Sequence, residues 1–317
     1  MPLCRFALLI AAILVSPPVH AESSKDPHVL VLGTAQDGGL PQIGSRSPQS
    51  ERARRDPDAR RLVASLLIVD PRSGTRWLID ATPDIREQVE RAEGHPPTRK
   101  TRGARPPLFE GIFLSHAHMG HYTGLIHLGR EAYGAHKMPV HASARMCEFL
   151  RKNAPWDLLV RAEHIQLHPF QPGEPVQLTP DLTVTPFQVP HRDEYTDTMG
   201  FLIKGPRRSL LYIPDIDKWD RWKRPVEDLI ATVDIALLDG TFYADGEIPG
   251  RAMAEIPHPF ILESLKRFAT LPVSERRKIR FIHLNHTNPA ADPTGSEARK
   301  IRETGMDITE EGQQFSL

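Results

Sequence analysis

Three histidines lie within six residues of one another, at His116, His118 and His121, directly after the apolar run 111–115. In an extended chain, residues two apart point to the same side, so His116 and His118 can converge on one ion. His121 begins the next segment and adds a third imidazole. Imidazole nitrogen suits zinc, copper, iron and nickel, and three such ligands beside an open position are typical of a catalytic metal. The spacing therefore predicts a metal site.

Further polar residues stand at the ends of other apolar, strand-like runs. They are Asp80, His191, Asp215, His283 and His286. A polar residue after a strand is often only a turn former. Their shared position favours a common site, because loops at strand ends can converge on one edge of a sheet.

The elements that must position these residues are short apolar runs that alternate with helical patterns. Strands are expected at 28–33, 65–70, 76–80, 111–115, 182–189, 200–204, 209–214, 234–238 and 279–284. Helices are expected at 84–92, 121–133, 143–152, 225–231, 259–268 and 296–303. This alternation predicts a layered α/β protein whose sheets are covered by helices. Residues 44–61, rich in Arg and Pro, are predicted to form a mobile loop.

Composition excludes several classes of protein. The chain has 317 residues, with 40 Lys and Arg against 40 Asp and Glu, and 39% of it is hydrophobic. These values are typical of a globular protein with a sizeable core, and they disfavour both a disordered chain and a polycation that forms stable complexes with nucleic acid. The sequence leaves the oligomeric state open.

The first 21 residues have the features of a secretory signal peptide. Arg5 precedes the apolar run 6–15, and the small-x-small triplet 19–21 is a cleavage signal. We therefore expect a mature chain of residues 22–317 that forms one domain, is periplasmic or secreted, and has no membrane span. Cys147 is the only cysteine beyond the leader, so no internal disulfide and no thiolate metal cluster is expected.

The arrangement resembles that of the metallo-β-lactamase superfamily. Its pattern is an Asp after an early strand, then His-x-His-x-Asp-His, a distant His, a bridging Asp and a final His. The resemblance implies the four-layer αββα sandwich of that family. It also implies a first metal on His116, His118 and His191, a bridging Asp215, and a second metal on His121 and His286, with the choice between His283 and His286 as the last ligand left open. Asp80 would fix the orientation of loops and imidazoles around the metals.

Within that superfamily, four segments are similar to the pyrroloquinoline quinone biosynthesis protein B family. They are VLGTAQDGGLPQIG, LLDGTFY, EIPH and FIHLNHTNP. In the phosphodiesterase and tRNase Z branch, a His after a DxTF-like strand assists the chemistry, and His258 of EIPH would take that part as ligand or general acid. The resemblance implies one or two zinc ions, with iron as the alternative.

The chain also departs from these patterns. Gly120 stands where the family motif has Asp, so the second metal would keep His121, His286 and Asp215 at most, and we expect one metal or a weakly held second. The cysteines that follow LPQ and hold a structural zinc in the quinone-biosynthesis relatives are missing from 44–49. With the leader, these differences favour an exported relative over a cytoplasmic enzyme of cofactor synthesis.

The expected chemistry is hydrolysis. A metal on three imidazoles lowers the pKa of its water towards ~7 and polarises a carbonyl or phosphoryl oxygen. The hydroxide would attack an ester, amide or phosphodiester of a small-molecule or phosphodiester substrate, Asp215 would orient the water, and His258 or His286 would protonate the leaving group. Three alternatives stay open: an iron-dependent oxidative enzyme, a β-lactamase-type amide hydrolase, and a non-catalytic binding protein with a damaged site.

Overall fold

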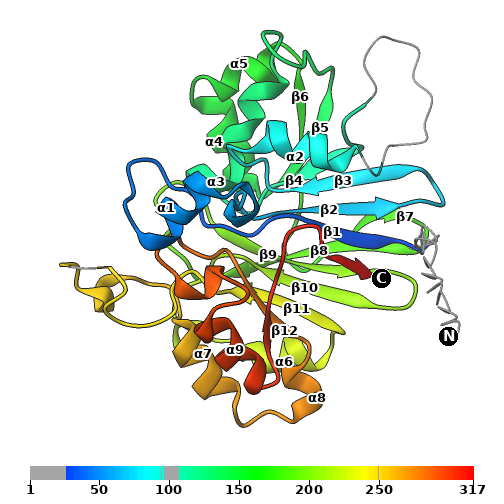
Figure 1. Ribbon diagram of the computed structural model, residues 1–317. Coiled ribbons are helices and arrows are strands. Elements are labelled where there is room, and N and C mark those ends of the chain that lie inside the picture. The colour runs from blue at the N-terminus through cyan, green and yellow to red at the C-terminus, as the bar shows by residue number, and fades with distance from the viewer. Residues whose placement is uncertain (1–25, 94, 96–106, 249) are drawn as a thin grey trace, which may run out of the picture.

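The computed structural model describes residues 26–93, 95, 107–248 and 250–317 (Figure 1). The leader predicted at residues 1–21 lies outside the described residues. Within the described residues, no helix combines the length and the apolar character that crossing a membrane requires.

Two sheets of seven strands each lie face to face at the centre of the described chain (Figure 1). The first runs in the order β14 (Gln314–Ser316), β1 (His28–Gly33), β2 (Ser65–Asp70), β3 (Thr75–Ile79), β4 (Gly111–Phe113), β5 (Met138–Ala142) and β6 (Ile165–Pro169). The second runs β13 (Asp307–Ile308), β12 (Ile279–Ile282), β11 (Ile235–Asp239), β10 (Ser209–Ile213), β9 (Thr198–Lys204), β8 (Leu182–Val189) and β7 (Val176–Thr179). In both sheets, four adjacent strands pair in parallel and the other pairs are antiparallel.

Helices cover the outer face of each sheet (Figure 1). The α-helices are α1 (Pro48–Arg55), α2 (Ile85–Ala92), α3 (Met119–Tyr122), α4 (Ala144–Lys152), α5 (Trp156–Arg161), α6 (Val226–Ala231), α7 (Ile261–Phe268), α8 (Val273–Arg276) and α9 (Ser296–Glu303). Short 3-10 helices are η1 (Pro57–Ala59), η2 (Thr123–Leu128), η3 (Trp219–Arg221), η4 (Met253–Glu255) and η5 (Pro289–Ala291). Figure 1 shows α2, α4 and α5 on the side of the first sheet and α6 to α9 on the side of the second.

Burial on both faces explains the apolar character of the central strands. Every residue of β1, β2 and β11 is buried. Phe113, Phe201 and Tyr212 belong to the core between the sheets, which is distinct from the cores beneath the helices. Strands covered on both faces read as continuous apolar runs, whether they pair in parallel, as β11 does, or antiparallel, as β1 and β2 do. The layered α/β expectation is therefore confirmed.

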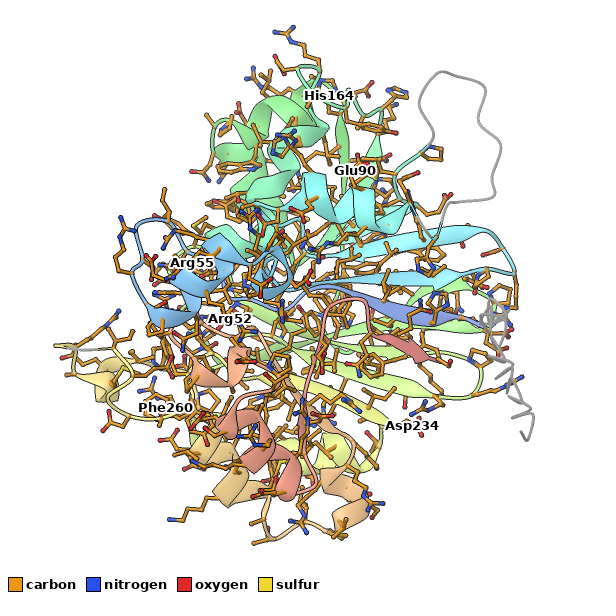
Figure 2. All side chains as sticks on the ribbon, viewed as in Figure 1. Arg52, Arg55, Glu90, His164, Asp234 and Phe260 are labelled. Carbon is orange, nitrogen blue, oxygen red and sulfur yellow. The ribbon has the colours of Figure 1, made fainter. Side chains whose placement is uncertain are left out.

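The segment 44–61 is not the loop that its composition predicted. The side chain of Ser47 caps α1 by accepting a hydrogen bond from the backbone N–H of Ser50, and Pro48 occupies the first turn. Ser47 Oγ also donates to the carbonyl of His286 at 3.0 Å. Arg52 pairs with Asp292 at 2.5 Å, and Figure 2 shows it on the face of the molecule near the C-terminal segments. These distant partners hold a helix that has little apolar surface.

The helix expected over 121–133 is also shorter than predicted. It is divided into α3 and η2, and a turn follows. The backbone N–H of Gly124 donates to the carbonyl of Ala81 at 2.9 Å instead of continuing the helix. This contact ties the segment after the His cluster to the end of β3.

His141 of β5 lies in the first sheet, away from the His cluster. Its ring stacks on Phe113 with centroids 4.6 Å apart, and the ring of His168 lies 5.2 Å away. Burial, with the nearby His168 adding to it, lowers the pKa of His141 to about 4. The folded state therefore rejects a proton that the unfolded chain binds below a pKa of about 6.5.

We expect this difference to weaken the fold in acid. As the pH falls from about 6.5 towards 4, the unfolded state takes up the proton and stability is lost; above about pH 6.5 the full stability is present. Between pH 7.5 and 5.0, His141 should lower the free energy of unfolding by about 1 kcal/mol. The value is modest because the ring is partly exposed and solvent screens its charge. Urea unfolding at both pH values should show a smaller pH effect in His141→Phe than in the wild type. Equal effects would contradict this, and His136→Phe on the exposed surface is the control.

Candidate metal centre

The polar residues that follow the strands gather at one edge of the two sheets. They come from the ends of β1, β3, β4, β8, β10, β11 and β12, and from the segment before α7. The residues are Asp37, Asp80, His116, His118, His121, His191, Asp215, Asp239, His258 and His283. Residues distant in the chain thus form one cluster.

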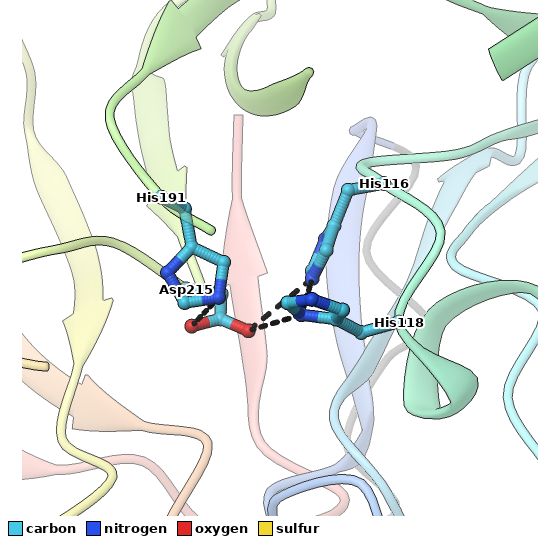
Figure 3. A group of neighbouring side chains, drawn as sticks. All are labelled: His116, His118, His191 and Asp215. Carbon is cyan, nitrogen blue, oxygen red and sulfur yellow. Dashed lines mark hydrogen bonds and ion pairs between the residues drawn. The ribbon is translucent and has the colours of Figure 1, made fainter. Parts of the chain in front are cut away.

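The first group of potential ligands is His116, His118, His191 and Asp215, whose ligand atoms all lie within 4.8 Å of one another (Figure 3). His116 Nε2 is 2.8 Å from His118 Nδ1. Asp215 Oδ2 lies 3.3 Å from His116 Nε2, and Asp215 Oδ1 lies 3.2 Å from His191 Nε2. The two sheets contribute two residues each: His116 and His118 follow β4 of the first sheet, and His191 and Asp215 follow β8 and β10 of the second.

The second group is Asp37, His121 and His283, again with ligand atoms within 4.8 Å of one another. Asp37 Oδ1 lies 3.4 Å from His121 Nε2 and 3.8 Å from His283 Nε2. Burial would raise the pKa of Asp37, but the two imidazoles outweigh it and hold that pKa well below its usual value. Asp215 Oδ2 is 3.8 Å from His121 Nε2, so its carboxylate lies between the two groups.

The structure places His283, and not His286, beside His121. His283 directly follows β12 and its ring is fully buried, with centroids 5.3 Å from that of His121. His286 belongs to neither ligand group, and its carbonyl accepts the hydrogen bond from Ser47 of the α1 cap. The assignment of the last ligand to His286 is therefore replaced by His283.

Asp80 controls the orientation of two imidazoles. Its carboxylate is fully buried and accepts hydrogen bonds from His121 Nδ1 at 2.7 Å, Ser115 N at 2.8 Å and Ser115 Oγ at 2.9 Å. Because Ser115 Oγ gives its proton to Asp80, it accepts the proton of His116 Nδ1, 3.0 Å away. Both imidazoles therefore carry their proton on Nδ1 and turn Nε2 towards the ligand groups.

Asp239 does the same in the other sheet. It accepts hydrogen bonds from Thr241 N and Oγ1 and from His258 Nδ1, at 2.8, 2.7 and 2.8 Å. Thr241 Oγ1 in turn lies 3.0 Å from His283 Nδ1, whose proton it accepts. His283 Nε2 is thereby directed towards Asp37.

The two remaining imidazoles of the first group have carboxylate partners of their own. His191 Nδ1 lies 3.2 Å from Asp217 Oδ1, which leaves Nε2 for the cluster. His118 Nε2 lies 2.9 Å from the exposed Glu194, which leaves Nδ1. A metal-bound imidazole ordinarily donates its other N–H to a fixed acceptor, and every imidazole of the two groups has one.

Backbone strain accompanies the site. Asp80 and His283 have φ values of 64° and 65°, in the left-handed region that non-glycine residues rarely adopt. Each directly follows its strand. Such conformations persist where the surroundings hold them, and they cluster at functional sites.

Burial and mutual charge set the electrostatics of the first group. Burial lowers the pKa of His116 well below its usual value. Burial would raise the pKa of Asp215, but the charges of His191 and His258 outweigh it and hold that pKa well below its usual range. Asp215 is therefore an ionised carboxylate among imidazole nitrogens.

His258 stands beside this group. Its Nδ1 is 2.8 Å from Asp239 Oδ2 and 3.2 Å from Asp215 Oδ1. Burial would lower its pKa, but the two carboxylates outweigh that effect and raise the pKa to about 9. The proton on Nδ1 is thus held by Asp239, and Nε2 carries the second proton of the charged ring.

Several buried atoms of the cluster have no hydrogen-bond partner. They are Asp37 Oδ1, His121 Nε2, His191 Nε2, Asp215 Oδ1 and His283 Nε2. Buried polar atoms are nearly always paired, so convergent unpaired ones require a partner. Imidazole nitrogen and carboxylate oxygen are donors that zinc and iron accept. The residues therefore fit a metal ion.

Sequence reasoning did not assign a role to Asp37 or Asp239, and it preferred His286 to His283. Asp239 directly ends β11, the position that had singled out Asp80 and Asp215. Asp37 lies four residues beyond β1, so its side chain could be placed only once the path of that loop was known. The position of His283 at a strand end made it a candidate, but the resemblance to the family motif favoured His286 of the same segment.

The fold agrees with the comparison to known families. The sequence model of the beta-lactamase superfamily domain matches residues 75–285. The chain therefore belongs to the beta-lactamase superfamily and has the metallo-β-lactamase fold, as the resemblance had indicated.

Within the superfamily, the chain is similar to coenzyme PQQ synthesis protein B. It is 30% identical to that protein from Xanthomonas campestris pv. campestris (strain B100), over 91% of this chain and 99% of the relative. The crystal structure of zinc-bound PqqB from Methylobacterium extorquens superposes with a TM-score of 0.76 at 23% identity, over 92% of this chain and all of the other. A diphosphatase of the PhnP family superposes with a TM-score of 0.64 at 22% identity, over 92% and 97%.

We expect Asp80→Asn to weaken metal binding without removing a ligand. The amide keeps one acceptor oxygen in place of two, so its nitrogen opposes either the backbone N–H of Ser115 or the protons of Ser115 Oγ and His121 Nδ1, which weakens the orientation of the rings. Loss of such a partner typically costs 10- to 100-fold in metal affinity. Competition with a chromogenic chelator would measure the dissociation constant for zinc.

The milder Ser115→Ala, which removes only the link to His116, should cost about tenfold and guards against a folding defect in Asp80→Asn. Asp58→Asn on the exposed surface is the matched control. Unchanged zinc affinity in both site variants would show that Asp80 does not orient the ligands.

Proposed function

We propose that the protein is a metal-dependent hydrolase that cleaves an ester, amide or phosphodiester bond. The observation that carries the proposal is the convergence of His116, His118, His191 and Asp215 directly beside His258, with His191 Nε2 and Asp215 Oδ1 buried and without a hydrogen-bond partner. These residues would hold the first metal. Bound zinc or iron lowers the pKa of water and polarises a carbonyl or phosphoryl oxygen.

The chain's own residues supply the remaining steps. Asp215 is ionised and its two oxygens face different imidazoles, so it can accept a hydrogen bond from the attacking water and orient it. His258 is fixed through Nδ1 by Asp239, and it donates the proton on Nε2 to the leaving group. In the proposed hydrolysis, Asp215 orients the nucleophile and His258 supplies the proton for the leaving group.

A phosphodiester is the substrate class that we favour. An alkoxide leaving group with a high pKa requires protonation as it departs, and a fixed His–Asp pair provides the proton. The diphosphatase of the PhnP family, whose fold this chain shares, acts on a phosphate bond by its name. The predicted leader adds the proposal that this reaction takes place in the periplasm or outside the cell.

A second candidate function is an oxidative step on a small molecule with iron at the same ligands. This alternative comes from the similarity to coenzyme PQQ synthesis protein B, a protein that by its name takes part in the synthesis of a coenzyme and that matches 91% of the chain. Iron content and oxygen consumption of protein purified from its native compartment distinguish this candidate from hydrolysis.

The first test concerns the metal. His116→Ala and His118→Ala should each lose chelator-sensitive cleavage of bis(p-nitrophenyl) phosphate by about 10³-fold or more, because the ion loses a ligand. The same assay with an ester and a β-lactam identifies the bond that is cleaved. His136→Ala on the exposed surface is the control. Wild-type turnover in either site variant would overturn the assignment.

The second test concerns His258. His258→Ala should lower kcat by about 10²- to 10⁴-fold for a phenyl phosphodiester, whose leaving group needs a proton. The loss should be much smaller for the p-nitrophenyl ester, which departs as a stable anion. Measuring both substrates on zinc-loaded protein separates proton donation from a metal defect. An equal loss for both leaving groups would show that His258 is not the donor.

A further inference from the structure

The His-x-His-x-Asp-His motif of the superfamily is incomplete in this chain, because Gly120 replaces its Asp. Gly120 lies in α3 and is buried. Without that carboxylate, the second ligand group would consist of His121 and His283 with Asp215 beside them.

The space of a side chain at position 120 is already occupied. A Cβ atom on Gly120 would lie 2.1 Å from Asp37 Oδ1, 2.9 Å from Asp37 Cγ and 2.7 Å from Asp37 Cα. These distances are far below van der Waals contact. Asp37 at its observed position and any side chain at position 120 therefore exclude each other.

Backbone pairing holds Asp37 at this place. Ala35 forms bridges with Val63 and with Leu284. The backbone N–H of Gln36 donates to the carbonyl of Leu284 at 2.9 Å, and that of Leu284 donates to the carbonyl of Thr34 at 2.8 Å. Because Leu284 directly follows His283, the segment before Asp37 is fixed alongside a ligand of the second group.

The carboxylate of Asp37 turns one oxygen towards the two imidazoles. Oδ2 accepts a hydrogen bond from the side chain of Gln36 at 3.5 Å, whereas Oδ1 is buried and makes no hydrogen bond. The side chain of Asp37 is 20% exposed and those of His121 and His283 are fully buried. The Nε2 atoms of both imidazoles are also unpaired.

We propose that Asp37 is the carboxylate ligand of a second metal ion, in place of the Asp that the motif lacks. With His121 and His283, it forms a set of one oxygen and two nitrogens that suits zinc or iron. Gly120 is required because only glycine leaves room for Asp37. This proposal rests on the proposed function, since Asp215 would link the second ion to the first.

Metal content tests the proposal without any activity assay. Zinc per chain is measured by elemental analysis after dialysis against a zinc buffer. The wild type should hold two equivalents, and Asp37→Gly should hold one. Asp37→Asn, which keeps the volume of the side chain, gives the same comparison if the glycine variant fails to fold. Asp58→Gly on the exposed surface should keep two.

An exchange variant tests the position of the carboxylate. Gly120→Asp alone should lose the second equivalent, because the new side chain collides with Asp37. Asp37→Gly combined with Gly120→Asp should recover it, since the carboxylate then comes from the motif position; because the new Cβ would still lie 2.7 Å from the Cα of residue 37, the more flexible glycine has to let the backbone there move apart. A double variant that binds no more zinc than either single variant would contradict the proposal that Asp37 takes the place of a carboxylate at position 120.

The remaining outcomes separate this proposal from the one on which it rests. Two equivalents in Asp37→Gly would show that Asp37 is only a fixed anion beside the imidazoles. One equivalent in the wild type, lost in His116→Ala, would overturn the second site and leave the hydrolase proposal intact. No zinc in the wild type would overturn both.

Discussion

A buried carboxylate at the end of a strand in each sheet decides where the imidazole lone pairs of this site point. Asp80 and Asp239 each hold one imidazole directly and a second through a hydroxyl, Ser115 or Thr241. Since an ionised carboxylate only accepts hydrogen bonds, each hydroxyl donates to its carboxylate and each imidazole Nδ1–H donates to the hydroxyl or to the carboxylate. The tautomers are fixed before any ligand arrives.

The sheets carry this arrangement because their inner faces are packed against each other. The core between them anchors the strand ends from which the ligand-bearing segments start. The left-handed backbone of Asp80 and His283 is tolerated for the same reason. Ligands from opposite sheets can then meet with errors smaller than a bond length, as a metal site demands.

The sequence predicted the parts of the molecule that depend on local pattern. The strands at 28–33 and 182–189 have the boundaries that their apolar runs indicated, and the spacing of His116 and His118 placed both in one group. β5 and β6 were missed because they contain Pro and His and are only partly apolar. Helix α1 was missed because distant polar partners hold it. Asp37 was not predicted because the conformation of a loop, and not a regular spacing of residues in the sequence, brings it to His121.

The contact between Gly120 and Asp37 also restricts how such a site can change over generations. A carboxylate can enter from either position, but the two side chains cannot coexist in the observed backbone. A lineage that moved the carboxylate from one element to the other had to pass through an ancestor with small residues at both places, or with a displaced loop. The order of such substitutions is therefore constrained, and an intermediate with small residues at both places would have to function with an incomplete second ligand group.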